Sequence, residues 1–205
     1  MASTREQVIK RRKARAFRRK VAAIAIIILI IAGAVLVYQF GGKTSPSEPA
    51  KVVLVTSMGN ITIQLYDDMP ITTRNFKNLT KLGIYDNTIF HRVVHDFVVQ
   101  GGDPTGTGQG DPSIATIPDE YSRNAEHNRN DKYTMAMAKT SQLNSATSQF
   151  FINLKYNSDL DNNYSVFGKV VAGMNVVDDI GEVATDSNDR PMQEVKLTKA
   201  MLIGG

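Results

Sequence analysis

The stretch that decides the fold is Phe90–Asp103, which reads FHRVVHDFVVQGGD. Its β-branched and aromatic residues predict two short strands around a break at His95–Asp96. Arg92 belongs to the first of these strands, and Val98 and Gln100 share one face of the second because residues two apart in a strand point the same way. The spacing alone does not show that the two faces meet, so the stretch by itself predicts a strand pair and no chemistry.

Further motifs follow this stretch in a fixed order. They are Gly101–Gly110 (GGDPTGTGQG), Met135–Lys139 (MAMAK), Ser145–Asn153 (SATSQFFIN) and Ser165–Val170 (SVFGKV). Together with FHRV and QGGD they resemble the motifs of cyclophilin-type peptidyl-prolyl cis–trans isomerases, here of a membrane-anchored, bacterial-like kind. The resemblance runs from about Lys51 to the C-terminus and rests on the whole combination, since any one motif alone would be weak.

The region from residue 51 to residue 205 is predicted to be one domain, made mainly of strands. The pattern indicates strands at Val52–Thr56, Ile61–Tyr66, Tyr133–Ala138, Gln149–Leu154, Val166–Val171 and Glu194–Leu202, besides the pair around Arg92. It indicates helices at Met69–Leu82, where Asp67 or Asp68 can cap the first turn, and at Met174–Ile180. Strands with two helices favour a closed antiparallel barrel, which leaves no exposed sheet edge. The resemblance implies a mainly β fold: a closed eight-stranded antiparallel barrel capped by two α-helices.

The N-terminal part predicts a membrane anchor. Val21–Phe40 contains no charged residue, and a helix of this length spans about 30 Å, the thickness of a bilayer core. A buried core helix is disfavoured for Val21–Phe40, because nine Lys and Arg residues precede it directly. A cleaved signal peptide has a shorter apolar region of roughly 7–15 residues, so a retained transmembrane helix over residues 21–40, bound to membrane lipid, is preferred. Residues 41–50 (GGKTSPSEPA) are predicted to be a linker.

The charge is distributed unevenly between the tail and the rest of the chain. Residues 1–20 hold nine Lys and Arg and one acid, whereas the remainder holds 15 bases and 19 acids, out of 24 and 20 in total. Basic residues beside an apolar span stay in the cytoplasm, so we expect a cytoplasmic tail and an extracytoplasmic domain. The mildly acidic remainder argues against nucleic acid as a partner, and we expect a monomer.

Isomerisation of an Xaa-Pro bond needs no nucleophile, general base, metal or cofactor, because no bond breaks. The barrier of about 18–20 kcal/mol comes from amide resonance. A donor aimed at the prolyl nitrogen withdraws its lone pair from resonance, and an arginine, always charged and with five N–H groups, suits that task. The resemblance implies that Arg92 and Gln100 are catalytic. It implies that the substrate-binding residues are His91, Phe97, Val98, Ala138, Gln149, Phe151, Leu160 and Tyr164, which act on proline-containing polypeptides.

Several positions depart from the family pattern. Val98 stands in place of a methionine and Tyr164 in place of a histidine. Lys139 stands in place of an asparagine, and Asp159 in place of the tryptophan that contributes to cyclosporin binding in many eukaryotic members. The resemblance therefore still implies isomerase activity. The departure at Asp159 predicts weak inhibition by cyclosporin.

Other chemistries receive little support from the sequence. The chain has no cysteine, which excludes disulfides and thiolate catalysis. His91 and His95 are four apart, but Arg92 follows the first histidine in a strand pattern, where a metalloprotease helix has glutamate. A peptide-binding chaperone or an anchored scaffold, neither of which requires turnover, remains as an alternative to the enzyme. An intact Arg92 and Gln100 favour the enzyme.

Overall fold

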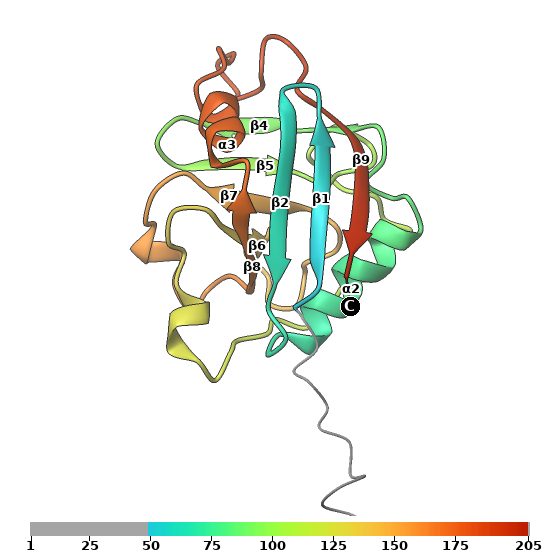
Figure 1. Ribbon diagram of the computed structural model, residues 1–205, viewed down its shortest axis with the longest axis vertical. Coiled ribbons are helices and arrows are strands. Elements are labelled where there is room, and N and C mark those ends of the chain that lie inside the picture. Colours follow the sequence, from blue (N-terminus) through green and yellow to red (C-terminus); the bar gives the residue numbers. More distant parts are fainter. Residues whose placement is uncertain (1–48, 205) are drawn as a thin grey trace, which may run out of the picture. The chain divides into compact units, whose positions relative to one another are not determined.

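The computed structural model describes residues 49–204 (Figure 1). The predictions for the tail at 1–20, the anchor at 21–40 and most of the linker at 41–50 therefore lie outside the described residues. Within residues 49–204 no helix is long and apolar enough to cross a membrane.

A single antiparallel sheet of nine strands dominates the domain, in the order β3-β9-β1-β2-β8-β6-β7-β5-β4. The strands are β1 (Lys51–Thr56), β2 (Gly59–Leu65), β3 (Thr88–Ile89), β4 (Arg92–Val94), β5 (Val98–Gly101), β6 (Thr134–Met137), β7 (Phe150–Asn153), β8 (Val166–Ala172) and β9 (Lys196–Ile203). The helices are α2 (Pro70–Lys81) and α3 (Met174–Gly181), with short 3-10 turns η1 (Ala125–Asn128) and η2 (Ser158–Leu160). The mainly β class and both predicted helices are confirmed.

The predicted closed barrel of eight strands is found only in its coarser form, because the described residues form one curled sheet of nine strands whose order ends at β3 and β4. In the ladder order its terminal strands are β3, which pairs with β9, and β4, which pairs with β5. A single antiparallel bridge also joins Ile89 of β3 to Asp103, which follows β5. Only Phe90 and His91 separate β3 from β4 along the sequence. The Phe90 N–H donates to the Val195 carbonyl at 2.9 Å, and the Val93 N–H donates to the Asp189 carbonyl at 2.8 Å. Between the two sheet ends the chain itself crosses from β3 to β4, supported by these single backbone bonds and one bridge, and no continuous ladder is formed there among the described residues.

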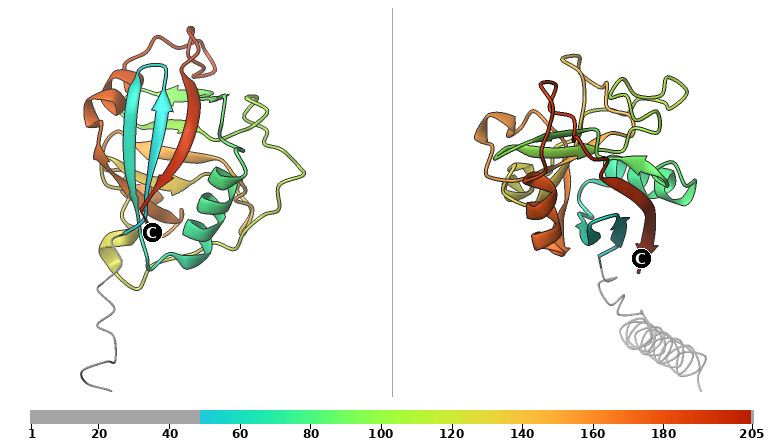
Figure 2. Two further views of the ribbon diagram at one scale, coloured as in Figure 1. Left: turned by 45° about the vertical axis from the view of Figure 1, so that its right-hand side comes forward. Right: turned by 90° about the horizontal axis from the view of Figure 1, so that it is seen from above.

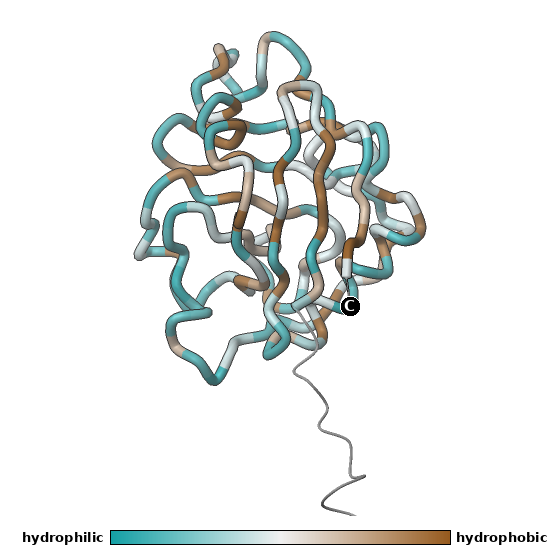
Figure 3. Tube along the Cα trace, viewed as in Figure 1, coloured by the Kyte–Doolittle hydropathy of each residue, from teal (hydrophilic) through white to brown (hydrophobic). Residues whose placement is uncertain are grey.

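Apolar residues recur along the strands (Figure 3). Their buried side chains form the core, and every second residue of β1 and all residues of β6 and β7 are buried. Phe76 of α2 is fully buried and lies 4.8 Å from Tyr85, 5.7 Å from Phe150 and 5.1 Å from Phe167, measured between ring centroids. Pairs of aromatic rings at such distances add about 0.5–1.5 kcal/mol to the effect of their burial. This cluster ties α2 to the sheet strands from inside.

The two helices lie at opposite ends of the curled sheet (Figure 2), with α2 packed against β9, and α3 against β2, β4 and β5. The start of α2 is not capped by Asp67 or Asp68. Instead, the Glu120 carboxylate, from a distant loop, accepts hydrogen bonds from the backbone N–H groups of Ile71 (3.0 Å) and Thr72 (2.7 Å). A carboxylate at this position also interacts favourably with the helix dipole, and it fastens the long loop before β6 to the rest of the domain.

Candidate active site

Strand register brings the sequence-predicted catalytic pair together. Arg92 of β4 lies opposite Gln100 of β5, and Gln100 lies opposite Phe151 of β7. Residues directly opposite in an antiparallel pair have their Cβ atoms about 4.5–5.5 Å apart. The three side chains therefore form a row across neighbouring strands, which the sequence spacing alone could not establish.

A pocket of about 190 Å³, which we call the Arg92 pocket, opens beside this row. It is lined by Arg92, Phe97, Val98, Gln100, Ala138, Lys139, Phe151, Leu160 and Tyr164. The structure thus gathers most of the predicted site residues around one cavity. The Phe151 and Tyr164 rings meet edge to face, with centroids 5.4 Å apart and planes at 81°. Aromatic pairs favour this geometry, and the two rings form part of the apolar wall of the pocket.

The Arg92 guanidinium is held by one exposed ion pair. Its Nε lies 3.3 Å from Asp189 Oδ2, and the two side chains are 38% and 44% exposed. Exposed pairs of this kind contribute only about 0.2–1 kcal/mol, so a ligand can compete for the guanidinium at low cost. Asp189, which lies 97 residues away in the sequence, carries no local pattern that could have identified it as a partner.

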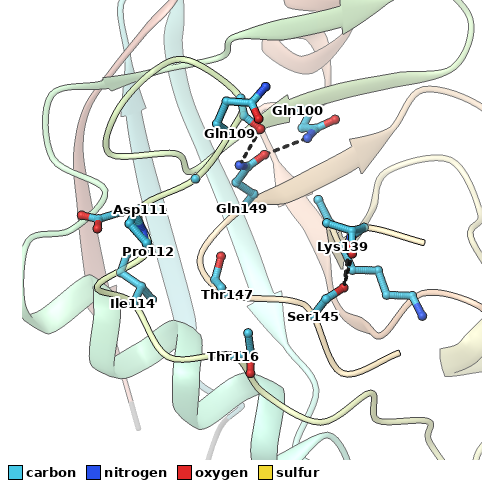
Figure 4. A pocket seen from close by; sticks show the side chains of 14 residues that line it. Gln100, Gln109, Asp111, Pro112, Ile114, Thr116, Lys139, Ser145, Thr147 and Gln149 are labelled. Carbon is cyan, nitrogen blue, oxygen red and sulfur yellow. Dashed lines mark hydrogen bonds between the residues drawn. The ribbon is translucent and has the colours of Figure 1, made fainter. Parts of the chain in front are cut away.

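Gln100 is oriented by a chain of side-chain amides. Its Nε2 donates to Gln149 Oε1 at 2.9 Å, and Gln149 Nε2 donates to the Gly108 carbonyl at 3.1 Å (Figure 4). Gln149 does not line the Arg92 pocket. It lines the neighbouring cavity of about 350 Å³, which we call the Gln149 pocket and which shares Gln100, Ala138 and Lys139 with the first.

The comparison with known proteins decides the family. A family model described as "Cyclophilin type peptidyl-prolyl cis-trans isomerase/CLD" matches residues 51–202. The chain belongs to the cyclophilin family. Peptidyl-prolyl cis-trans isomerase CYP18-2 of Arabidopsis thaliana is 44% identical over 158 residues, covering 76% of this chain and 94% of the plant protein. Peptidyl-prolyl cis-trans isomerase ppi1 of Schizosaccharomyces pombe is 45% identical over 157 residues, covering 75% of this chain and 99% of the yeast protein.

Solved structures agree with this assignment. A Cryptosporidium parvum cyclophilin-type peptidyl-prolyl cis-trans isomerase, crystallised in the presence of the dipeptide Ala-Pro, matches with a TM-score of 0.70 and 31% identity over 76% of this chain and 99% of that one. The cyclophilin AquaCyp293 of Hirschia baltica matches with a TM-score of 0.63 at 20% identity, over 77% of this chain and 74% of that one. The second likeness shows the cyclophilin fold alone.

His91, a predicted substrate contact of this cyclophilin domain, lines neither pocket. The side chain is buried, and neither ring nitrogen has a hydrogen-bond partner among the described residues. A Cβ atom at Gly108 would lie 3.3 Å from His91 Cδ2, which places the imidazole directly behind the glycine-rich loop. Burial lowers the pKa of His91, against the opposing pull of the nearby Asp103 carboxylate. His91 therefore packs beneath the glycine-rich loop as a buried side chain.

Lys139, which stands in place of a family asparagine, is also a pocket residue, and the sequence did not predict this. It lines both pockets, and its Nζ lies 2.8 Å from Asp119 Oδ2, with the two side chains 9% and 8% exposed. The same Nζ lies 5.8 Å from the centroid of the Tyr164 ring, within cation–π range. The family asparagine is thus replaced by a buried ion pair in the wall that the two pockets share.

Among residues 49–204, no group of three or more His, Asp or Glu is arranged to hold a metal ion. His95, one half of the histidine pair seen in the sequence, instead pairs with Glu182 at 2.8 Å on the surface. Asp159, which stands in place of the family tryptophan, lies in η2 beside Leu160.

Proposed function

We propose that this cyclophilin domain catalyses cis–trans isomerisation of Xaa-Pro peptide bonds at the Arg92 pocket. The observation that carries the proposal is the row of Arg92, Gln100 and Phe151 across β4, β5 and β7, beside a cavity with one apolar wall. Relatives of domain length bear the name of this activity. The Cryptosporidium parvum structure was obtained with Ala-Pro, the smallest peptide that contains the bond in question.

The pocket residues divide the work. Phe97, Val98, Phe151 and Leu160 hold the pyrrolidine ring by apolar contact, while the carbonyl before the proline rotates. Arg92 donates to the prolyl nitrogen, which becomes pyramidal and accepts a hydrogen bond only when the amide is twisted. A donor aimed at that geometry stabilises the transition state more than the ground state. No bond is made or broken, so no residue needs to act as nucleophile or base.

A binding or scaffold module without turnover is the second candidate. It would share the apolar pocket but would have no use for a guanidinium at its rim. Arg92 is only lightly held by Asp189, with both side chains more than a third exposed, and this arrangement leaves the donor available to a substrate. The weak ion pair between Arg92 and Asp189 therefore favours the enzyme over the binding module.

Exchange of a short Ala-Pro peptide measured by NMR with the full chain distinguishes the two functions. Uncatalysed exchange takes tens to hundreds of seconds, so we expect a large acceleration at substoichiometric protein, with the matched Ala-Ala peptide neither bound nor altered. Binding of Ala-Pro without any acceleration would support the binding module and contradict the enzyme.

We further propose that residues 21–40 anchor the protein in a membrane as a monomer, with the tail in the cytoplasm and the isomerase domain outside. The uncharged run and the bases before it support this. Exported and surface proteins would then be its folding substrates. Protease added to intact cells should remove the domain. Protection until lysis would reverse the orientation, and a mature chain beginning near residue 41 would show a cleaved signal.

A further inference from the structure

The glycine-rich segment that follows β5 does more than join two elements. We propose that Asp103 is a positioning residue for the reaction: through Gly108 and Gln149 it fixes which end of the Gln100 amide faces the Arg92 pocket. This inference rests on the proposed function, because it concerns the orientation of a group at the same site.

Asp103 is the centre around which the loop folds. Its side chain is fully buried. Oδ1 accepts from the Thr105 N–H at 2.9 Å and from the Thr105 hydroxyl at 2.8 Å, and Oδ2 accepts from the N–H groups of Gly108 at 2.7 Å and Gly110 at 3.1 Å. Burial alone would raise the pKa of Asp103, but the hydrogen bonds from Thr105, Gly110 and Gly108 outweigh it and lower the pKa. Both oxygens are therefore charged acceptors.

The position of Gly108 depends on this carboxylate. The segment has no regular secondary structure there, so no ladder of backbone bonds holds it. Gly108 adopts φ +85°, a left-handed conformation that side-chain-bearing residues rarely take. The Asp103 carboxylate accepts from the N–H groups of Gly108 and Gly110, one on each side of the Gly108–Gln109 peptide. These two bonds thus hold the peptide whose carbonyl, that of Gly108, accepts from Gln149.

The polarity of the amide chain follows from that carbonyl. A carbonyl can only accept, so Gln149 must turn its Nε2 toward Gly108, at 3.1 Å, and its Oε1 toward Gln100. Oε1 can only accept in turn, so Gln100 presents its Nε2, at 2.9 Å. Gln100 Oε1 is then left as an acceptor for the guanidinium of Arg92 opposite it, or for a backbone N–H of the substrate. Without the Gly108 carbonyl, both amides could rotate and present a donor to a cation.

The first test is Asp103→Asn in the full chain. Asparagine keeps one acceptor oxygen, so its NH₂ faces the N–H group either of Thr105 or of Gly108 and Gly110. In both orientations Gly108 loses its bond to a charged acceptor, and the loop around it is held less firmly. We expect kcat/KM for an Xaa-Pro peptide to fall about tenfold, mainly through kcat, as for the loss of one good hydrogen bond. Asp86→Asn is the matched control, because the Asp86 carboxylate accepts from the Ala200 N–H at 3.0 Å outside both pockets. It should leave kcat unchanged.

The decisive test combines these changes with Gln149→Ala. If Asp103 acts through Gln149, Asp103→Asn slows the wild type but not the Gln149→Ala variant. Thr105→Val weakens the same carboxylate more gently, serves if Asp103→Asn fails to fold, and should also lose its effect in that background. Losses in kcat that add up independently, or a loss of thermal stability with unchanged kcat, would overturn the inference. Absence of isomerase activity in the wild type would instead refute the proposed function itself.

Discussion

The buried pair of Lys139 and Asp119 gives a stability prediction that can be worked out from its geometry. At 2.8 Å the Coulomb attraction is about 6 kcal/mol for an effective dielectric constant of about 20. Removing each charge from water costs several kcal/mol, so the pair as a whole is close to neutral for stability, whereas one charge left alone is costly. We therefore expect Asp119→Ala to lower the free energy of unfolding by about 3–5 kcal/mol.

The double variant Asp119→Leu with Lys139→Met should recover most of this loss, because a well-packed apolar pair avoids both desolvation costs. Asp131→Ala is the control, since its ion pair with Arg129 at 3.0 Å is 46% and 45% exposed and should contribute only about 0.2–1 kcal/mol. Urea unfolding of the wild type and the three variants, followed by circular dichroism, measures these differences in the free energy of unfolding. A double variant as unstable as Asp119→Ala, or an Asp119→Ala loss no larger than the control, would refute the reasoning.

Three further predictions concern other parts of the domain. The pKa of His91 is lowered by burial, so below its ordinary value of 6.5 the unfolded state binds more protons than the folded state and stability falls with falling pH. Unfolding curves of His91→Gln should lack that part of the slope, and an identical slope would contradict the assignment. Glu120→Gln removes the charge from the cap on the N–H groups of Ile71 and Thr72 and should cost about 1 kcal/mol in urea unfolding. An unchanged free energy of unfolding would mean that the Glu120 charge does not stabilise α2. Asp159 in place of tryptophan predicts weak cyclosporin inhibition at ordinary turnover, and tight inhibition would show that the position matters little.

Periodicity predicted the elements of this domain well because their causes are local. Pro70 begins α2, where its missing N–H would have no partner in the helix anyway. The alternating residues of β1 and β2 bury every second side chain. The strands on both sides of His95–Asp96 were predicted and correspond to β4 and β5. The separate strand β3 was not predicted, nor that Phe90 and His91 carry the chain from one end of the sheet to the other. That crossing depends on contacts with Val195 and Asp189, which are far away in the sequence.

The candidate site was predictable through the order of its motifs and not through geometry. Nothing near Arg92 indicates that Gln100 faces it, and the resemblance to cyclophilins supplied that step. Asp189, Asp119 and Glu120 were missed for a common reason: each lies in an aperiodic loop and meets its partner across the fold. His91 was expected at the substrate, but a small glycine loop covers it, and a single sequence does not reveal such coverage.

The most direct test of the account is to separate rate from affinity at Arg92. If the guanidinium acts on the twisted amide, Arg92→Ala should slow exchange by roughly 10²–10³, by analogy with the loss of an oxyanion-hole donor, while the peptide affinity changes little. Arg92→Lys should restore only part of the rate, because a point charge lacks the planar fork of donors. Exchange and binding of one Xaa-Pro peptide, both measured by NMR, provide the two numbers. Equal losses of rate and affinity in Arg92→Ala would show that Arg92 only anchors the substrate, and no loss of either would place the active site elsewhere.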